Sequence, residues 1–172
     1  MAKGAVAAKR SQLERSLVGP AAEHFVLYKL HGRGFLATLA PENAPTVDIL
    51  VMNPDETITA LIQVKARTRG ADKGWHMQQK HEGFIGKTLF YAFVDLEEDP
   101  PITYIVPAAV VADVINKTHA VWLSRPGLKG QPHRDHPMRR VLPSYEGVEG
   151  YPPGWLMKYR ERWEDLRGKP RT

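Results

Sequence analysis

The 172-residue chain contains no cysteine, which excludes disulfide bonds and thiolate metal sites. It also lacks any apolar run near the roughly 20 residues that a membrane-spanning helix needs. Residues 1–12 carry Lys3, Lys9 and Arg10 without a long apolar stretch, so we expect no secretory signal. Acidic residues are fewer than basic ones, 19 against 24, and the net charge of +5 permits a polyanionic partner. We therefore expect a cytoplasmic protein with no membrane contact.

The composition is otherwise that of a folded domain, with 42% hydrophobic and 25% charged residues. A chain of this length can bury a sizeable core, and no internal repeat divides it. We expect a single domain over residues 1–172, with a basic N-terminal extension at about 1–12 and a basic loop at about 125–140. That loop contains five basic residues against one acid, Asp135.

Hydrophobic spacing predicts both helices and strands along the chain. The predicted helices cover residues 11–30, with a break near Pro20, and residues 107–116. Apolar residues at helical spacing predict a final helix at 155–166. The predicted strands cover residues 35–39, 47–52, 58–66, 88–96 and 102–106. Residues 75–83 are ambiguous, with a short helix as one interpretation.

Two of these strands carry polar side chains at positions that would be apolar in a fully buried strand. From Val47 to Met52 every residue except Asp48 is apolar. In the following strand, Gln63 and Lys65 are two residues apart, so both side chains point to the same face. A turn signal at residues 53–56 joins the strands, and a hairpin centred there pairs residue i with residue 111 − i.

That register sets Asp48 directly opposite Gln63, with their Cβ atoms roughly 5 Å apart. An acid, an amide oxygen and the Lys65 ammonium would then converge on one patch, which is typical of a metal and phosphate site. The alternative is an ordinary cross-strand ion pair between Asp48 and Lys65, or a lysine that reaches past the strand to solvent. Glu23 lies on the inward face of the first helix; its alternative is a first-turn glutamate favoured by the helix dipole.

A helix glutamate, a strand aspartate and a Gln-x-Lys motif in the next strand resemble the PD-(D/E)XK nuclease superfamily. In that family the acids and the motif Glu or Gln bind divalent ions, and the lysine orients the attacking water. The later sequence is similar to small, stand-alone, mostly uncharacterised bacterial members of the superfamily. The stretches that carry this similarity are residues 73–76, 80–82, 89–96, 104–107 and 126–133.

The resemblance implies a restriction-endonuclease-like α/β fold with a mixed, mostly antiparallel central sheet flanked by helices. It implies a metal-dependent endonuclease acting on DNA, with Mg²⁺ or Mn²⁺ as cofactor. Glu23, Asp48, Gln63 and the Val64 carbonyl would be the metal ligands. Lys65 would be catalytic beside the Glu23, Asp48 and Gln63 side chains. Because cutting both strands of a duplex needs two sites, a homodimer is a further expectation.

Two positions depart from the family pattern. Val47 stands where a proline precedes the motif aspartate, and Gln63 stands where a glutamate is usual, which removes one negative charge. The second change makes a catalytically inactive, nucleic-acid-binding relative the alternative function. A protein-interaction module without nucleic acid is a third.

Basic residues after the active strand and in the 125–140 loop are candidates for phosphate contact, and Trp75 either packs in the core or stacks on a base. The candidate nucleic-acid-binding residues are Arg67, Arg69, Lys73, Trp75, Lys129 and Arg134. In the same loop, His133, Asp135 and His136 fit no firm zinc spacing, so we favour a basic loop that faces nucleic acid or solvent.

Overall fold

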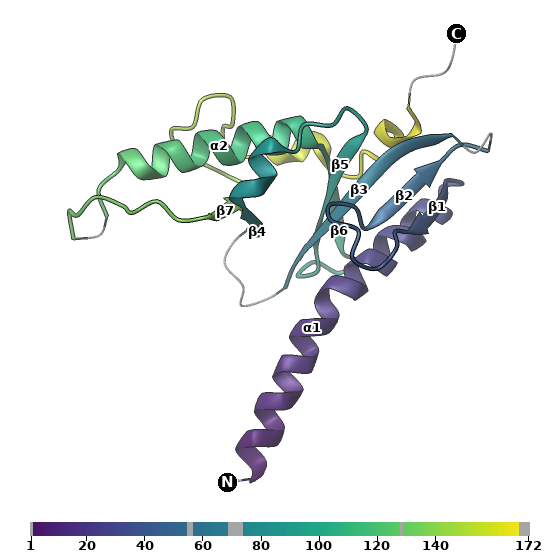
Figure 1. Ribbon diagram of the computed structural model, residues 1–172, viewed down its shortest axis with the longest axis horizontal. Coiled ribbons are helices and arrows are strands. Elements are labelled where there is room, and N and C mark those ends of the chain that lie inside the picture. The colour runs from purple at the N-terminus through teal and green to yellow at the C-terminus, as the bar shows by residue number, and fades with distance from the viewer. Residues whose placement is uncertain (1, 55–56, 69–73, 128, 169–172) are drawn as a thin grey trace.

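The computed structural model describes residues 2–54, 57–68, 74–127 and 129–168, with side chains from residue 14 onward (Figure 1). Its centre is a five-stranded sheet in the order β1-β2-β3-β5-β6. Neighbouring strands are antiparallel except β3 and β5, which are parallel, so the predicted mixed, mostly antiparallel sheet is confirmed. The strands are β1 (Leu36–Leu39), β2 (Ile49–Met52), β3 (Ile58–Arg67), β5 (Leu89–Asp95) and β6 (Ile102–Pro107).

One helix covers each face of this sheet (Figure 1). The core beneath α1 (Ala2–His31) includes Ala60, Ile62 and Val64 of β3. The core beneath α2 (Ala108–Ser124) includes Tyr91 and Phe93 of β5. Because side chains alternate along a strand, Gln63 and Lys65 lie on the α2 side of β3.

The pairing of β2 with β3 has the predicted register. Ile49 lies opposite Ile62, Leu50 opposite Leu61 and Val51 opposite Ala60, and a bulge follows at Met52. That bulge lies at the turn end of the hairpin, so it does not shift the pairing near Asp48.

The helix predictions need three corrections. α1 starts at Ala2 and continues through Pro20, whereas we expected the helix to start at residue 11 and to break at the proline. Strong helix formers such as alanine, lysine and arginine fill its first half and favour the longer helix. α2 ends at Ser124 rather than near 116.

The predicted final helix is instead two 3₁₀ turns, η2 (Trp155–Tyr159) and η3 (Trp163–Arg167). Arg160 is extended and Glu161 has a φ of 53°, so a continuous helix cannot pass through them.

The two segments that sequence spacing left undefined form a second, two-stranded sheet. β4 (Trp75–Gln78) pairs antiparallel with β7 (Met138–Val141), which overlaps the end of the predicted basic loop. A 3₁₀ turn, η1 (Gln79–Gly83), follows β4 directly. The short helix considered for residues 75–83 is therefore limited to the second half of that range.

Glu161 fastens the C-terminal segment to the rest of the domain. Its carboxylate accepts hydrogen bonds from Thr103 N and Trp163 Nε1, each at 2.9 Å, and pairs with Lys29 at 3.1 Å and Arg33 at 3.3 Å. Burial acts to raise the pKa of Glu161, but these donors outweigh it and the pKa lies below its usual value. One carboxylate thus joins α1, β6 and η3.

We predict that Glu161→Gln lowers the free energy of unfolding at pH 7 by about 1–3 kcal/mol, because the partners lose a charged acceptor. Since the folded-state pKa is depressed, the wild-type advantage is present above the ordinary glutamate value of 4.5. It should shrink as the pH falls through the folded-state value. Urea denaturation at several pH values measures this. Glu164→Gln, which removes an exposed pair with Arg167, is the control. Equal losses in the two variants would contradict the role of Glu161.

Candidate functional site

Asp48 immediately precedes β2 and is fixed through three hydrogen bonds. Its N–H donates to Ile62 O and its carbonyl accepts from Ala40 N, both at 2.8 Å. Its carboxylate Oδ2 accepts from Val64 N at 2.6 Å. The side chain is therefore held against the middle of β3, at the level of Gln63.

Gln63 is only 8% exposed, which is unusual for an amide side chain. Its Oε1 atom is buried and accepts no hydrogen bond from any residue that the structure describes. A buried acceptor without a donor costs roughly 1–3 kcal/mol. Such an atom is what a bound cation or water would satisfy.

Glu23 lies on α1, which covers the face of the sheet opposite to Gln63 and Lys65. It is half-buried between Ala22 and Val26, both of which belong to the core. Burial raises the pKa of its carboxyl group, and the negative charge of Asp48 raises it further. The positive charges of His24 and Lys65 act in the opposite direction. Glu23 is thus within electrostatic reach of both Asp48 and Lys65.

Lys65 completes the group from β3. Burial lowers the pKa of its ammonium, while the Asp48 and Glu23 carboxylates oppose that shift and Lys80 adds to it. The structure therefore holds the Asp48 carboxylate on the backbone next to Gln63, and the charges of Glu23 and Lys65 act on the same group. Among the described residues, no three His, Cys, Asp or Glu side chains form a metal-binding group. Any cation here must rely on amide or backbone oxygens as well.

Two aromatic residues that the sequence did not single out form the wall beside Gln63. Tyr91 lies next to Gln63 in the β3–β5 register, and its hydroxyl is 2.8 Å from His81 Nδ1. Burial, followed by the charges of Lys65 and Lys80, lowers the pKa of His81 to about 4, so its ring is neutral at pH 7. His81 lies in the ambiguous stretch after residue 75, where no periodicity could place it.

Trp75 cannot stack on a base, so that prediction is wrong. It is fully buried, and its Nε1 donates to Val94 O at 3.0 Å. The Arg67 guanidinium lies over the Trp75 ring and forms an ion pair with Asp95. The charge of Arg67 is therefore balanced inside the protein. Arg69 and Lys73 lie outside the described residues.

The 125–140 segment folds against α2 rather than extending as a loop throughout. His133 stacks on Trp122 with ring centroids 4.0 Å apart, and His119 Nε2 lies 2.7 Å from Asp135 Oδ1. Lys129 and Arg134 are exposed, as contact with a phosphate requires.

Comparison with known proteins supports the fold alone. No family model and no curated protein matches the sequence. The structure is similar to that of a bacterial homing endonuclease, with a TM-score of 0.50 and 12% identity over 87% of this chain and 90% of the other. The chain thus has a nuclease-like fold. No helix among the described residues is both long and apolar enough to cross a bilayer.

We predict that Asp48→Asn moves the pKa of Glu23 back toward its ordinary value of 4.5, because the like charge disappears. The contribution of burial should remain, since asparagine keeps an oxygen for Val64 N. Carboxyl-carbon NMR titration in EDTA measures the shift. Asp113→Asn, on α2, is the control. An unchanged Glu23 titration in Asp48→Asn would mean that the two carboxylates do not interact.

Proposed function

We propose that the protein is a metal-dependent nuclease that hydrolyses phosphodiester bonds in DNA. The observation that carries this proposal is the buried Gln63 Oε1, to which no described residue donates, one strand away from a fixed Asp48 carboxylate. If these residues only stabilised the fold, we would expect Asp48 to form an ion pair with Lys65. We would also expect a donor to satisfy the Gln63 amide oxygen. The two oxygen donors are of the kind that a hard cation prefers, which supports a metal site here.

The donors suit Mg²⁺ or Mn²⁺, which prefer oxygen ligands and keep several waters. Asp48 and Glu23 would supply the charge, and Gln63 Oε1 a neutral ligand. The Val64 carbonyl would supply a fourth, because the N–H and C=O of a strand residue point to the same edge and Val64 N–H faces Asp48. We therefore assign these four residues to the PD-(D/E)XK ligand set.

The bound cation would neutralise charge on the phosphoryl oxygens and activate water for attack. Lys65 would hold the water and stabilise the charge that develops in the transition state. Its partly buried position strengthens this interaction, because fewer solvent dipoles compete with the ammonium. The neutral His81 beside it adds no competing positive charge.

The nuclease-like fold supports the same class of activity, since the similar structure is that of an endonuclease. The second candidate is a DNA-binding protein without catalysis. Gln63 favours it, because an amide in place of a carboxylate leaves the site with two acids and weakens its hold on a divalent cation.

For the metal, we predict that Gln63→Glu tightens Mn²⁺ binding at least tenfold, because a third carboxylate adds charge next to the ion. Isothermal titration calorimetry compares the two proteins. Gln131→Glu, which adds the same charge on an exposed loop, should leave the affinity unchanged. Equal or weaker binding by Gln63→Glu would remove Gln63 from the ligand set.

For catalysis, we predict that Lys65→Ala lowers Mn²⁺-dependent cleavage by about 100-fold or more while DNA affinity stays nearly constant, since Lys65 acts mainly in the transition state. Plasmid, four-way-junction and single-stranded substrates are incubated with Mn²⁺ or EDTA. The exposed Lys87→Ala is the matched control. If wild type cuts none of them, or Lys65→Ala cuts as well as wild type, the non-catalytic function replaces the enzyme.

A further inference from the structure

Tyr91 and Gln63 are neighbours on adjacent strands, on the same face of the central sheet. Gln63 of β3 pairs with Tyr91 of β5 in the parallel register, and residues paired in this way project to the same side. Both side chains are buried. A side chain that carries a hydroxyl donor therefore lies beside a buried amide oxygen to which no described residue donates.

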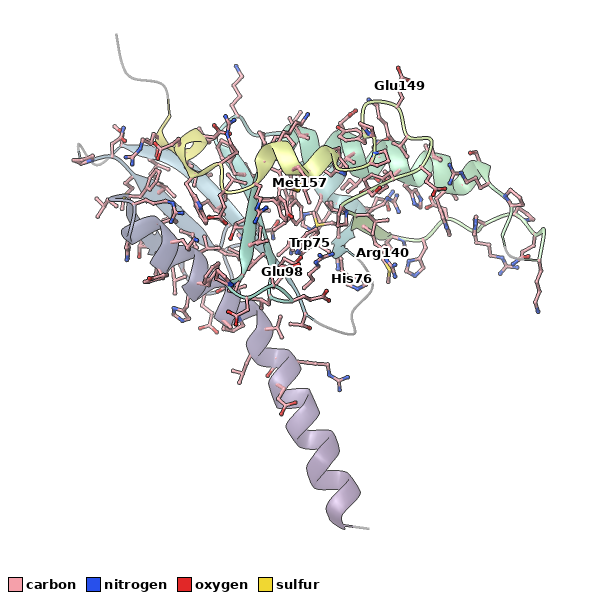
Figure 2. All side chains as sticks on the ribbon, turned by 180° about the vertical axis from the view of Figure 1, so that it is seen from behind. Trp75, His76, Glu98, Arg140, Glu149 and Met157 are labelled. Atoms are coloured by element: carbon pink, nitrogen blue, oxygen red, sulfur yellow. The ribbon has the colours of Figure 1, made fainter. Side chains whose placement is uncertain are left out.

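Two of the buried ring donors on this face are bonded to groups other than Gln63. Trp75 lies inside the domain (Figure 2), and its Nε1 donates to Val94 O at 3.0 Å. The Tyr91 hydroxyl lies 2.8 Å from His81 Nδ1. The environment of Gln63 Oε1 thus contains donors, but within the described part of the chain none is directed to it.

The hydrogen bond between Tyr91 and His81 has a preferred direction. His81 Nδ1 is the hydrogen-bond partner of the Tyr91 hydroxyl among the described residues. If Nδ1 carried a proton and donated, the buried hydroxyl hydrogen would lack an acceptor among these residues, which costs free energy. With the ring proton on Nε2, Nδ1 accepts and the hydroxyl is satisfied. The hydrogen bonding therefore favours a His81 ring protonated on Nε2.

Packing holds the His81 ring beside this hydroxyl. His81 is only 2% exposed, and its ring packs edge-on against Phe84 and Tyr91, with centroids 5.2 and 5.8 Å away. Burial lowers the pKa of His81 to about 4, so the ring is neutral at pH 7, as an acceptor nitrogen requires. The turn η1, which carries His81, is tied to β7 by a hydrogen bond from Arg139 to Glu82. The acceptor is therefore fixed in place.

We infer that His81 is a positioning residue for the metal site: by accepting the hydrogen bond of the Tyr91 hydroxyl, it keeps that hydroxyl from donating to Gln63 Oε1. This inference rests on the proposed nuclease function. An amide oxygen that already accepts a hydrogen bond must give it up to bind a cation, so a free oxygen binds metal more tightly. His81 acts through Tyr91 and touches neither cation nor substrate.

The first experiment needs no variant. Nitrogen-15 NMR of the histidine rings, recorded in EDTA at pH 7, distinguishes a protonated ring nitrogen from an unprotonated one. We expect Nδ1 of His81 to be unprotonated and Nε2 to carry the proton. A proton on Nδ1 would make His81 the donor to Tyr91 and would overturn the inference.

The second experiment tests the connection to Gln63 without metal. His81→Phe keeps an aromatic ring and removes the acceptor, so the Tyr91 hydroxyl should donate to Gln63 Oε1 and shift the side-chain carbonyl carbon resonance of Gln63. In the double variant His81→Phe/Tyr91→Phe the donor is gone, and the resonance should return toward its wild-type position. An unmoved resonance in His81→Phe contradicts the inference.

The third experiment measures Mn²⁺ affinity by calorimetry. His81→Phe should bind about 2- to 10-fold more weakly, because one hydrogen bond must now be broken. Adding Tyr91→Phe should restore the affinity, whereas damage to packing alone would persist or grow. His81→Asn should bind like wild type, since its side-chain oxygen, like Nδ1, is attached to Cγ and can accept. His133→Phe, the same exchange in the ring stacked on Trp122, is the control.

Failure of this inference and failure of the proposed function give different results. If wild type binds Mn²⁺ and Tyr91→Phe restores nothing in the His81→Phe background, the role of His81 is overturned and the metal-dependent function stands. If wild type binds no Mn²⁺, the function and the positioning role fall together.

Discussion

The hydrogen bond from Val64 N–H to the Asp48 carboxylate joins the chemistry of the site to the middle strand of the sheet. β3 lies between β2 and β5, and its alternate residues Ile62 and Val64 are buried under α1. That burial fixes the strand's rotation and leaves Gln63 and Lys65 on the other face. With Asp48 tied to the backbone between them, the distance between acid and amide no longer depends on side-chain freedom.

The same arrangement is energetically unfavourable in itself. Glu23 and Asp48 repel each other, as the raised pKa of Glu23 indicates, and burial weakens the ammonium that opposes them. Gln63 adds a buried oxygen to which no residue in the described part of the chain donates. Binding sites commonly keep such unfavourable groups because the ligand satisfies them. Stability must come from elsewhere, and contacts such as those of Glu161 supply it.

The hairpin was predictable from the sequence because two apolar runs and a short turn leave one register that buries both. Asp48, Gln63 and Lys65 stood out as the polar exceptions in those runs. The β4–β7 sheet was not predictable, since β7 reads Met-Arg-Arg-Val and pairs with a strand about sixty residues earlier. Its arginines resemble a solvated loop until the pairing is known. Trp75 followed a basic stretch and resembled a stacking residue, whereas tertiary packing buries it completely. His81 could not be placed either, because its neighbours show no period.

Adjacent arginines in β7 show how one short strand serves two purposes. Arg139 points inward and is held by Glu82 of η1, while Arg140 lies opposite His76 on the outward face. Exchanging their roles would bury an unpaired guanidinium and expose the anchor, so the register is as strongly specified here as in a hydrophobic strand. Glu82, which holds Arg139, belongs to the same turn as Lys80 and His81, so the anchor of β7 and the His81 ring are one piece of structure. The position of β7 and the position of His81 are therefore fixed through the same turn.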